Sequence, residues 1–434
     1  MIYWAPLFHF YQPPTQLPAV VMKISNESYR PIMDVFEDFP HAKATFNING
    51  VLTEMLALYG HTDILDKMRK LADNGQIEFT GSGKYHPILP LIPREEMERQ
   101  IRLNHSTNKQ YLGDAYRPRG FFPPEMCYSK DIVDPIIQSR HEWIIVSGIA
   151  CPVGWPMDVI HRIDNVDGDI AVFFRDDILS NKISFKDVDG KGFIEHLKQL
   201  HQGSGDIYVI TAMDAETFGH HIPHWDKLFL SQVYETLVPN PGYPGVMREQ
   251  KPLAGQHRKL FEYEKSRDEH EIRTVKISEL LDIFPKGEKV APKPSSWSTS
   301  IDDIKRENYY PLWKDPNNPV HALQWEHLDI AMVMTYRAMK IADNPASHQF
   351  ASNARAILDS ALHSCQFWWA SKKPMWDINM VYRGLNLQRE ALLNAYKSIS
   401  LSGRTPQTKR RFYYLVVAAR HIYTQITDYL YTEL

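Results

Sequence analysis

Short, almost wholly apolar runs alternate with longer polar segments over roughly the first 285 residues of the chain. Runs that are apolar on both faces are typical of strands in a parallel sheet covered by helices. Strands are predicted at 2–10, 44–48, 77–80, 120–122, 143–146, 170–174 and 207–213, and helical patterns fall between many of them, as at 54–74 and 95–111. Repeated strand-then-helix units predict a parallel sheet or barrel, whose site lies just beyond the carboxyl ends of the strands.

The pattern changes after about residue 284. Pro285, Pro292 and Pro294, followed by a serine-rich run at 295–300, interrupt any long regular element. Apolar residues at three-to-four spacing then predict four helices, at 321–343, 349–371, 378–400 and 406–432, the last with Thr405 as N-cap and Pro406 in its first position. We therefore predict an α/β barrel domain over 1–284, a Pro/Ser-rich connection over 285–320 that contributes to the site, and a helical domain over 321–434.

Composition and charge narrow the classes of protein. Of the 434 residues, 43% are hydrophobic and 12% aromatic, which permits a large core and excludes a disordered chain. The net charge is −3 without a lysine-rich run, and no apolar stretch approaches the ~18 residues that span a bilayer, so neither a nucleic-acid nor a membrane partner is expected. No signal-peptide pattern follows Met1, and the cysteines at 127, 151 and 365 are far apart. These features predict a cytoplasmic location.

Two carboxyl side chains follow the last predicted strand of the barrel region. Asp214 and Glu216 come directly after 207–213, and residues two apart in an extended chain project to the same side. Neighbouring carboxylates repel each other, which raises the pKa of one of them and suits it to act as a general acid. The alternative is a solvated acidic loop without chemistry.

Glu125 follows another predicted strand and two prolines. Pro123 and Pro124 end the strand, and their fixed φ holds the next residue rigidly. The surrounding residues are mostly apolar, namely Phe121, Phe122, Met126 and Tyr128. This setting suits a reactive carboxyl, although Pro-Pro-Glu also suits the first turn of a helix.

Polar side chains follow three further predicted strands. His9, Tyr11 and Gln12 end or follow the first strand, His86 lies in the segment after 77–80, and Arg175 comes after 170–174. Because strand ends converge in a barrel, five polar clusters at five strand ends favour a site more strongly than any single cluster.

The common cofactor and metal motifs are not found in the sequence. There is no GxSxG elbow, no Walker A sequence and no GxGxxG fingerprint. His220 and His224 have the spacing of a zinc-binding helix, but Pro223 between them argues against a helix there. We expect neither a cofactor nor a metal site.

With these residues in hand, the chain resembles glycoside hydrolase family 57, most strongly from 1 to about 280. The first family motif, His-x-His-Gln-Pro, is similar to residues 9–13, with Tyr11 in place of the second His, and the second motif is similar to 85–90. The third motif, which carries the nucleophilic Glu, places that role on Glu125. The fourth, Asp-x-Glu-x-Phe-Gly, is reproduced at 214–219 and places the acid/base role on Asp214. The nearest segment to the fifth motif, 366–377, departs from its Ser-Asp-Trp-like pattern.

The resemblance implies an incomplete (β/α)7 barrel followed by a helical bundle. It further implies a retaining glycoside hydrolase or transglycosylase that acts on α-glucans without a cofactor, of the α-amylase, amylopullulanase or 4-α-glucanotransferase type. Glu125 and Asp214 are the expected catalytic residues. Substrate contacts are expected from His9, Tyr11, Gln12, His86, Arg175, Glu216, His220, Trp297, Trp368, Trp369, Trp376 and Asp377.

Some of these expectations have alternatives. Six of the ten tryptophans lie between 297 and 376, as sugar-stacking side chains would, but Trp368 and Trp369 would also serve to fill a domain interface and Asp377 to cap the helix from 378. A metal-dependent carbohydrate deacetylase would use His220 and His224 with Asp214. A catalytically weak glycan-binding homologue is the other alternative, because the first and fifth motifs are altered.

Overall fold

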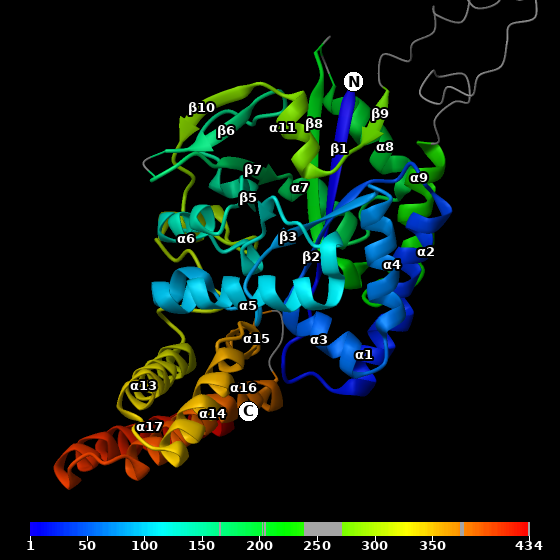
Figure 1. Cartoon of the computed structure of the whole chain (residues 1–434). Helices are drawn as coiled ribbons and strands as arrows, with labels where there is room; N and C mark the ends of the chain where they lie inside the picture. Colours follow the sequence, from blue (N-terminus) through cyan, green and yellow to red (C-terminus); the bar gives the residue numbers. More distant parts are fainter. Residues whose placement is uncertain (165, 202, 204, 238–270, 374–376, 433–434) are drawn as a thin grey trace, which may run out of the picture.

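The computed structural model describes residues 1–164, 166–201, 203, 205–237, 271–373 and 377–432 (Figure 1). A curled sheet forms the upper part of the molecule in that view, and a group of long helices lies below the carboxyl ends of its strands.

Seven parallel strands form the predicted barrel. In spatial order they are β8 (Ile207–Asp214), β1 (Ile2–Phe10), β2 (Ala44–Ile48), β3 (Ile77–Gly81), β4 (Gly120–Phe121), β5 (Trp143–Ser147) and β7 (Ala171–Arg175). The backbone N–H of Asp176 donates to the carbonyl of Ile210 at 2.8 Å, so the β7 and β8 edges approach each other. The strand order of the described residues nevertheless ends at β8, which confirms the incomplete (β/α)7 barrel.

Three strands of the described part of the chain were not predicted. β6 (Ile160–Ile163) lies antiparallel to β7, and β10 (Lys286–Val290) extends the sheet beyond β6. β9 (Ile272–Thr274) pairs with the first residues of β1, where β2 does not reach. The sequence of β10 is mostly charged and exposed, so it carries no apolar signal from which a strand is predicted.

Helices cover the outer face of the sheet. They include α1 (Pro18–Ile24), the π-helix η1 (Ser25–Tyr29), α2 (Arg30–Asp38), α3 (Gly50–Leu58), α4 (Thr62–Asp73), α5 (Arg94–Leu112), α6 (Val133–Gln138), α7 (Asp177–Ser184), α8 (Gly190–Leu200), the π-helix η8 (Asp226–Ser231), α9 (Gln232–Thr236) and α11 (Ile277–Ile283). The predicted helix over 54–74 is wrong as one element. The chain turns at Gly60, whose φ of 82° lies in the region that favours glycine, and separates α3 from α4.

Within the described residues, five helices follow the short α12 (Ile301–Lys305). They are α13 (Pro319–Ile341), α14 (Pro345–Ala361), α15 (Cys365–Trp368), α16 (Ile378–Leu401) and α17 (Pro406–Thr432). Thr405 Oγ1 accepts a hydrogen bond from Thr408 N at 3.3 Å and caps α17 as predicted. The predicted continuous helix over 349–371 is wrong. His363 forms a bridge with Pro87, and Ser364 N donates to His86 O at 3.0 Å, so a barrel loop takes the backbone groups that a continuous helix would use.

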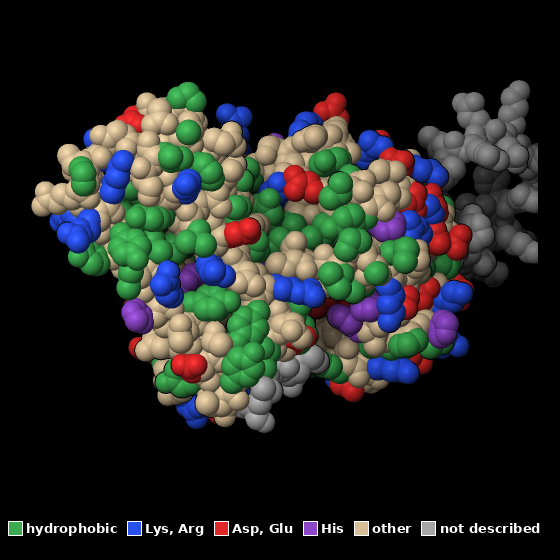
Figure 2. Space-filling model, turned by 90° about the horizontal axis from the view of Figure 1, so that it is seen from below, with side chains coloured by type: hydrophobic (Ala, Val, Ile, Leu, Met, Phe, Trp, Pro, Cys, Tyr) green, Lys and Arg blue, Asp and Glu red, His purple; other side chains and the backbone are tan. Residues whose placement is uncertain are grey.

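The barrel and the helical region share a hydrophobic core. One buried cluster runs from Phe121, Ile144 and Val172 of the sheet through Trp313 and Trp325 into the helical region. On the face seen in Figure 2, hydrophobic side chains gather over the helical region and where it meets the barrel. Within the described residues, no helix is both long and apolar enough to cross a bilayer.

Candidate active site

Glu125 is held in an unusual backbone conformation. It follows β4 directly after Pro123 and Pro124, and its φ of 58° lies in the left-handed region. His86, on the loop after β3, has the same φ of 58°. A left-handed non-glycine residue costs on the order of 1–3 kcal/mol, and such residues cluster at functional sites. Glu125, His86 and Met126, whose φ is 49°, place three such residues in this region.

The Glu125 carboxyl is contacted from three separate segments. Trp297 Nε1 donates to Oε2 at 2.9 Å, Ser364 Oγ donates to Oε1 at 3.5 Å, and His86 Nδ1 lies 3.6 Å from Oε1. The side chain is only 15% exposed. Burial, and secondarily the charge of Asp214, raise the pKa of Glu125 to about 8, whereas the two hydrogen bonds act in the opposite direction.

Asp214 and Glu216 form a carboxyl pair at the end of β8. Asp214 is half-buried, and burial raises its pKa against the opposing effect of Arg175. Glu216 Oε1 accepts hydrogen bonds from Gln12 Nε2 at 2.9 Å and from the Tyr29 hydroxyl. Burial, followed by the charge of Asp214, raises the pKa of Glu216, whereas the hydrogen bonds from Tyr29 and Gln12 act in the opposite direction. Because three carboxyl groups meet in one desolvated space, they cannot all be ionised near neutral pH.

A stack of aromatic rings lies beside Glu125. The rings of Tyr11 and His86 are stacked with their centroids 3.9 Å apart. The His9 ring stacks on His86 and on Phe122, with centroid distances of 4.9 Å and 4.8 Å. Burial lowers the pKa of His9 to about 4 and also lowers the pKa of His86, so both imidazoles are neutral. The stacked rings are therefore uncharged, and their polar nitrogen and oxygen atoms lie at the ring edges.

Arg175 presents a fixed positive charge to the site. Its Nε donates to Ala212 O at 2.7 Å, and its terminal nitrogens donate to Asp177 Oδ1 at 2.7 Å and to Asn181 Oδ1 at 3.0 Å. The guanidinium carbon lies 5.9 Å from the centre of the Trp297 ring. Each guanidinium nitrogen of Arg175 thus donates one hydrogen bond within the protein, and its positive charge acts to lower the pKa of Asp214.

Several of the expected substrate contacts also have partners within the protein. Trp368 and Trp369 are half-buried, contact each other edge to face at 4.7 Å, and pack against the cores of the helical region. Asp377 accepts hydrogen bonds from the backbone of residues 379 and 380 and caps α16. Trp376 lies outside the described residues.

The pair His220 and His224 does not form a helical metal motif. His220 Nδ1 donates to Glu27 Oε2 at 2.6 Å, while His224 is exposed and has a φ of 63°. In the parts of the chain that the structure describes, no three His, Cys, Asp or Glu side chains gather as metal ligands would.

Four residues at the site were missed by sequence reasoning. Asn47 Oδ1 lies 2.6 Å from His9 Nδ1, Ser364 contacts Glu125, Cys365 Sγ lies 3.6 Å from the Tyr11 hydroxyl, and Tyr29 contacts Glu216. Asn47 carried a usable signal, because it is a polar residue near the end of an apolar strand. The other three are brought to the site by long-range contacts.

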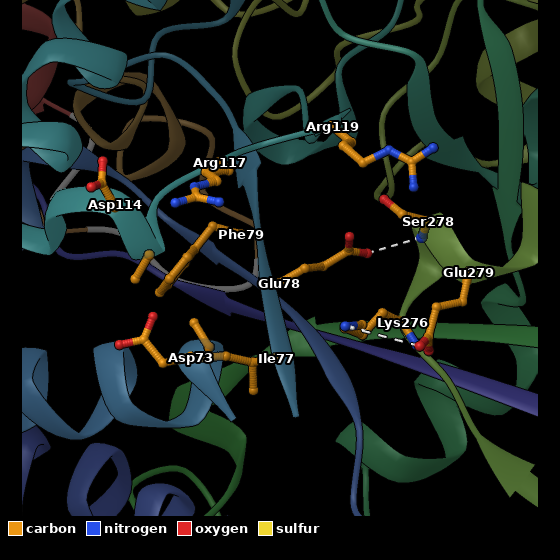
Figure 3. A pocket seen from close by; sticks show the side chains of 12 residues that line it. Asp73, Ile77, Glu78, Phe79, Asp114, Arg117, Arg119, Lys276, Ser278 and Glu279 are labelled. Atoms are coloured by element: carbon orange, nitrogen blue, oxygen red, sulfur yellow. Dashed lines mark hydrogen bonds and ion pairs between the residues drawn. The ribbon is translucent and has the colours of Figure 1, made fainter. Parts of the chain in front are cut away.

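A separate pocket of about 370 Å³ lies at the other end of the barrel, near the start of β3 (Figure 3). Glu78 projects into it but accepts hydrogen bonds from Ser278 N and from Thr45 Oγ1, both at 2.9 Å. The Glu78 carboxyl therefore stabilises the start of α11. In barrels of this kind, the end opposite the carboxyl ends of the strands serves stability rather than chemistry.

Part of the sequence is similar to known proteins. The sequence model of Glycosyl hydrolase family 57 matches residues 9–248, more than half of the chain. An alpha-amylase of Pyrococcus horikoshii is 26% identical over 219 residues, which are 49% of this chain and 33% of that protein. A 4-alpha-glucanotransferase of Thermococcus litoralis is 28% identical over 219 residues, 49% of this chain and 32% of that protein. The chain thus matches only about a third of the length of these curated relatives.

Solved structures share the fold over nearly the whole chain. A GH57-type branching enzyme from Pyrococcus horikoshii gives a TM-score of 0.68 at 16% identity, covering 98% of this chain and 95% of that one. The 4-alpha-glucanotransferase from Thermococcus litoralis gives 0.65 at 19% identity, covering 92% of this chain and 59% of that one. At these identities, the likeness establishes the arrangement of barrel and helical region.

Proposed function

Because the chain belongs to glycosyl hydrolase family 57, we propose that it is a retaining enzyme that cleaves the glycosidic bonds of α-glucans. The observation that carries the proposal is the meeting of Glu125 and Asp214, from the carboxyl ends of β4 and β8, in one desolvated cluster. The charge of Asp214 raises the pKa of Glu125, so the two carboxyl groups lie within electrostatic reach of each other. A separation of ~5–5.5 Å between the carboxyl groups is the geometry of retaining enzymes.

The reaction proceeds in two displacements. The Glu125 carboxylate attacks the anomeric carbon and forms a glycosyl ester, while the bond to the leaving oxygen breaks and that oxygen takes the proton of Asp214. The Asp214 carboxylate then removes a proton from water or from a sugar hydroxyl, whose oxygen attacks the same carbon and releases Glu125. Water gives hydrolysis and a sugar gives transfer, and neither step requires a cofactor.

The surrounding side chains fit these roles. The hydrogen bonds from Trp297 and Ser364 favour the carboxylate form of Glu125, which is the nucleophilic form. Nε2 of His86 is buried and has no partner among the described residues, so we assign it to a sugar hydroxyl. We also assign the half-buried rings of Tyr11 and Trp297 to packing against the C–H bonds of a sugar ring.

Product analysis on maltooligosaccharides, amylose and pullulan tests the substrate class and separates hydrolysis from transfer. Azide tests the assigned roles with α-glucosyl fluoride as substrate. Glu125→Ala should yield the β-glucosyl azide, because azide replaces the missing nucleophile. Asp214→Asn should yield the α-azide, because azide resolves an intact glycosyl ester. Wild-type rates in both variants would reject the assignment, and activity that depends on stoichiometric zinc would favour the deacetylase alternative.

A further inference from the structure

The π-helix η1 is attached to the loop that carries Asp214 and Glu216. The Ser28 hydroxyl donates to Ala215 O at 2.7 Å, and Glu27 Oε2 accepts from His220 Nδ1 at 2.6 Å. The Tyr29 hydroxyl donates to Glu216 Oε1. Three consecutive residues of one short element thus hold both ends of the 214–220 loop. π-helices are rare in proteins, and the single-turn segments that do occur are often found at functional sites.

Gly219 shows how closely the two segments approach. Its φ is 124°, and a Cβ at this position would lie 1.8 Å from the carbonyl oxygen of Glu27. Any residue other than glycine would push the loop away from η1. The contact between the segments is therefore built into the backbone as well as into the side chains.

Of the two carboxyl groups on this loop, Glu216 accepts hydrogen bonds from the described part of the protein and Asp214 does not. Glu216 Oε1 accepts from both Tyr29 and Gln12, and the Tyr29 side chain is fully buried. Among the residues that the structure describes, no group donates a hydrogen bond to the Asp214 carboxyl. Arg175 from β7 and Glu125 from β4 face Asp214, with opposite charges.

We propose that Tyr29, with Gln12, is a positioning residue that keeps Glu216 as the carboxylate, so that the proton shared by the Asp214–Glu216 pair resides on Asp214. The inference rests on the proposed function, in which Asp214 must give that proton to the leaving oxygen. Two donors on one oxygen stabilise the ionised form of Glu216. The adjacent negative charge then makes ionisation of Asp214 unfavourable, and Asp214 retains its proton until the glycosidic bond breaks.

Dependence on the leaving group distinguishes this role from a structural one. In Tyr29→Phe the proton moves toward Glu216, and acid assistance at Asp214 is weakened. General-acid catalysis contributes about 10²–10⁴-fold, so we expect kcat on maltooligosaccharides to fall about 10–100-fold. Fluoride leaves with far less protonation than a sugar alcohol, so the rate on α-glucosyl fluoride should fall less than about threefold. Gln12→Met should show the same pattern and serves as a second variant if Tyr29→Phe is unstable.

Tyr234→Phe is the matched control. Tyr234 is equally buried, lies in the same hydrophobic cluster, and its hydroxyl has no partner among the described residues. The rates of Tyr234→Phe on maltooligosaccharides and on α-glucosyl fluoride should both stay at the wild-type level. Equal losses on the two substrates in Tyr29→Phe, or no loss on either, would overturn the inference. Asp214→Asn must also lose more rate on maltooligosaccharides than on α-glucosyl fluoride, and by a larger factor than Tyr29→Phe. If it does not, the proposed function is wrong, whatever the role of Tyr29.

Discussion

Replacing Glu125 by Gln should stabilise the protein, and the gain should grow with pH. Glu125 has its pKa raised from 4.5 to about 8, chiefly by burial. A raised pKa means that the folded state binds the proton more tightly than the unfolded state. Its contribution to stability is therefore complete below pH 4.5 and is lost as the pH rises through 8. Glutamine resembles the protonated carboxyl and has no proton to lose.

The magnitude follows from that pKa. Each pKa unit corresponds to about 1.4 kcal/mol, so ionised Glu125 costs at most about 5 kcal/mol above pH 8. For a chain of 434 residues, the unfolding entropy of about 2.1 cal/mol/K per residue converts this cost to roughly 5 °C in Tm. Functional residues that reduce stability in this way are common at active sites.

Calorimetry of the wild type and Glu125→Gln at pH 5, 7 and 9 measures the effect. The Tm difference should be near zero at pH 5 and reach several degrees at pH 9, while turnover is lost at every pH. Glu390→Gln, at an exposed position on α16, should show no trend with pH. A Glu125→Gln variant that is less stable than the wild type, or whose Tm difference does not change with pH, would refute the electrostatic reasoning.

Three further outcomes are expected. The pH profile of kcat/KM should be bell-shaped, because the pair of Glu125 and Asp214 is active only while it holds one proton, and the higher pKa of the pair, about 8, sets the alkaline limb; a flat profile from pH 5 to 9 would contradict the roles. A chain truncated near Pro292 should lose activity even if it stays in solution, because Trp297 and Ser364 both contact Glu125, and full activity would contradict the helical region's part in the site. Dialysis against a chelator should leave activity unchanged, and a loss restored by zinc would contradict the two-carboxyl mechanism.

The strand ends that carry the site could be predicted because parallel strands buried on both faces leave a strong apolar signal. The predicted 2–10 and 44–48 coincide with β1 and β2, and the residues that follow them converge as expected. β10 is different, since a charged, exposed strand leaves no such signal. Its pairing with β6 depends on the rest of the sheet.

The contacts made by Ser364 and Tyr29 could not be predicted from local pattern. The helical periodicity runs through 349–371, and the chain breaks at 362–364 because the loop around His86 and Pro87 takes its backbone groups. Tyr29 lies on a π-helix, whose side-chain spacing matches neither a strand nor an α-helix. Both depend on contacts between residues distant in the sequence.

Trapping of the covalent intermediate tests the central claim most directly. A 5-fluoro-α-glucosyl fluoride should form a glycosyl-enzyme that hydrolyses slowly, because the added fluorine destabilises the charge that develops in both transition states. Peptide mass spectrometry of the trapped protein should place one sugar on Glu125. A sugar on another residue, or an active enzyme that turns over the reagent without any adduct and releases the inverted anomer, would contradict the account.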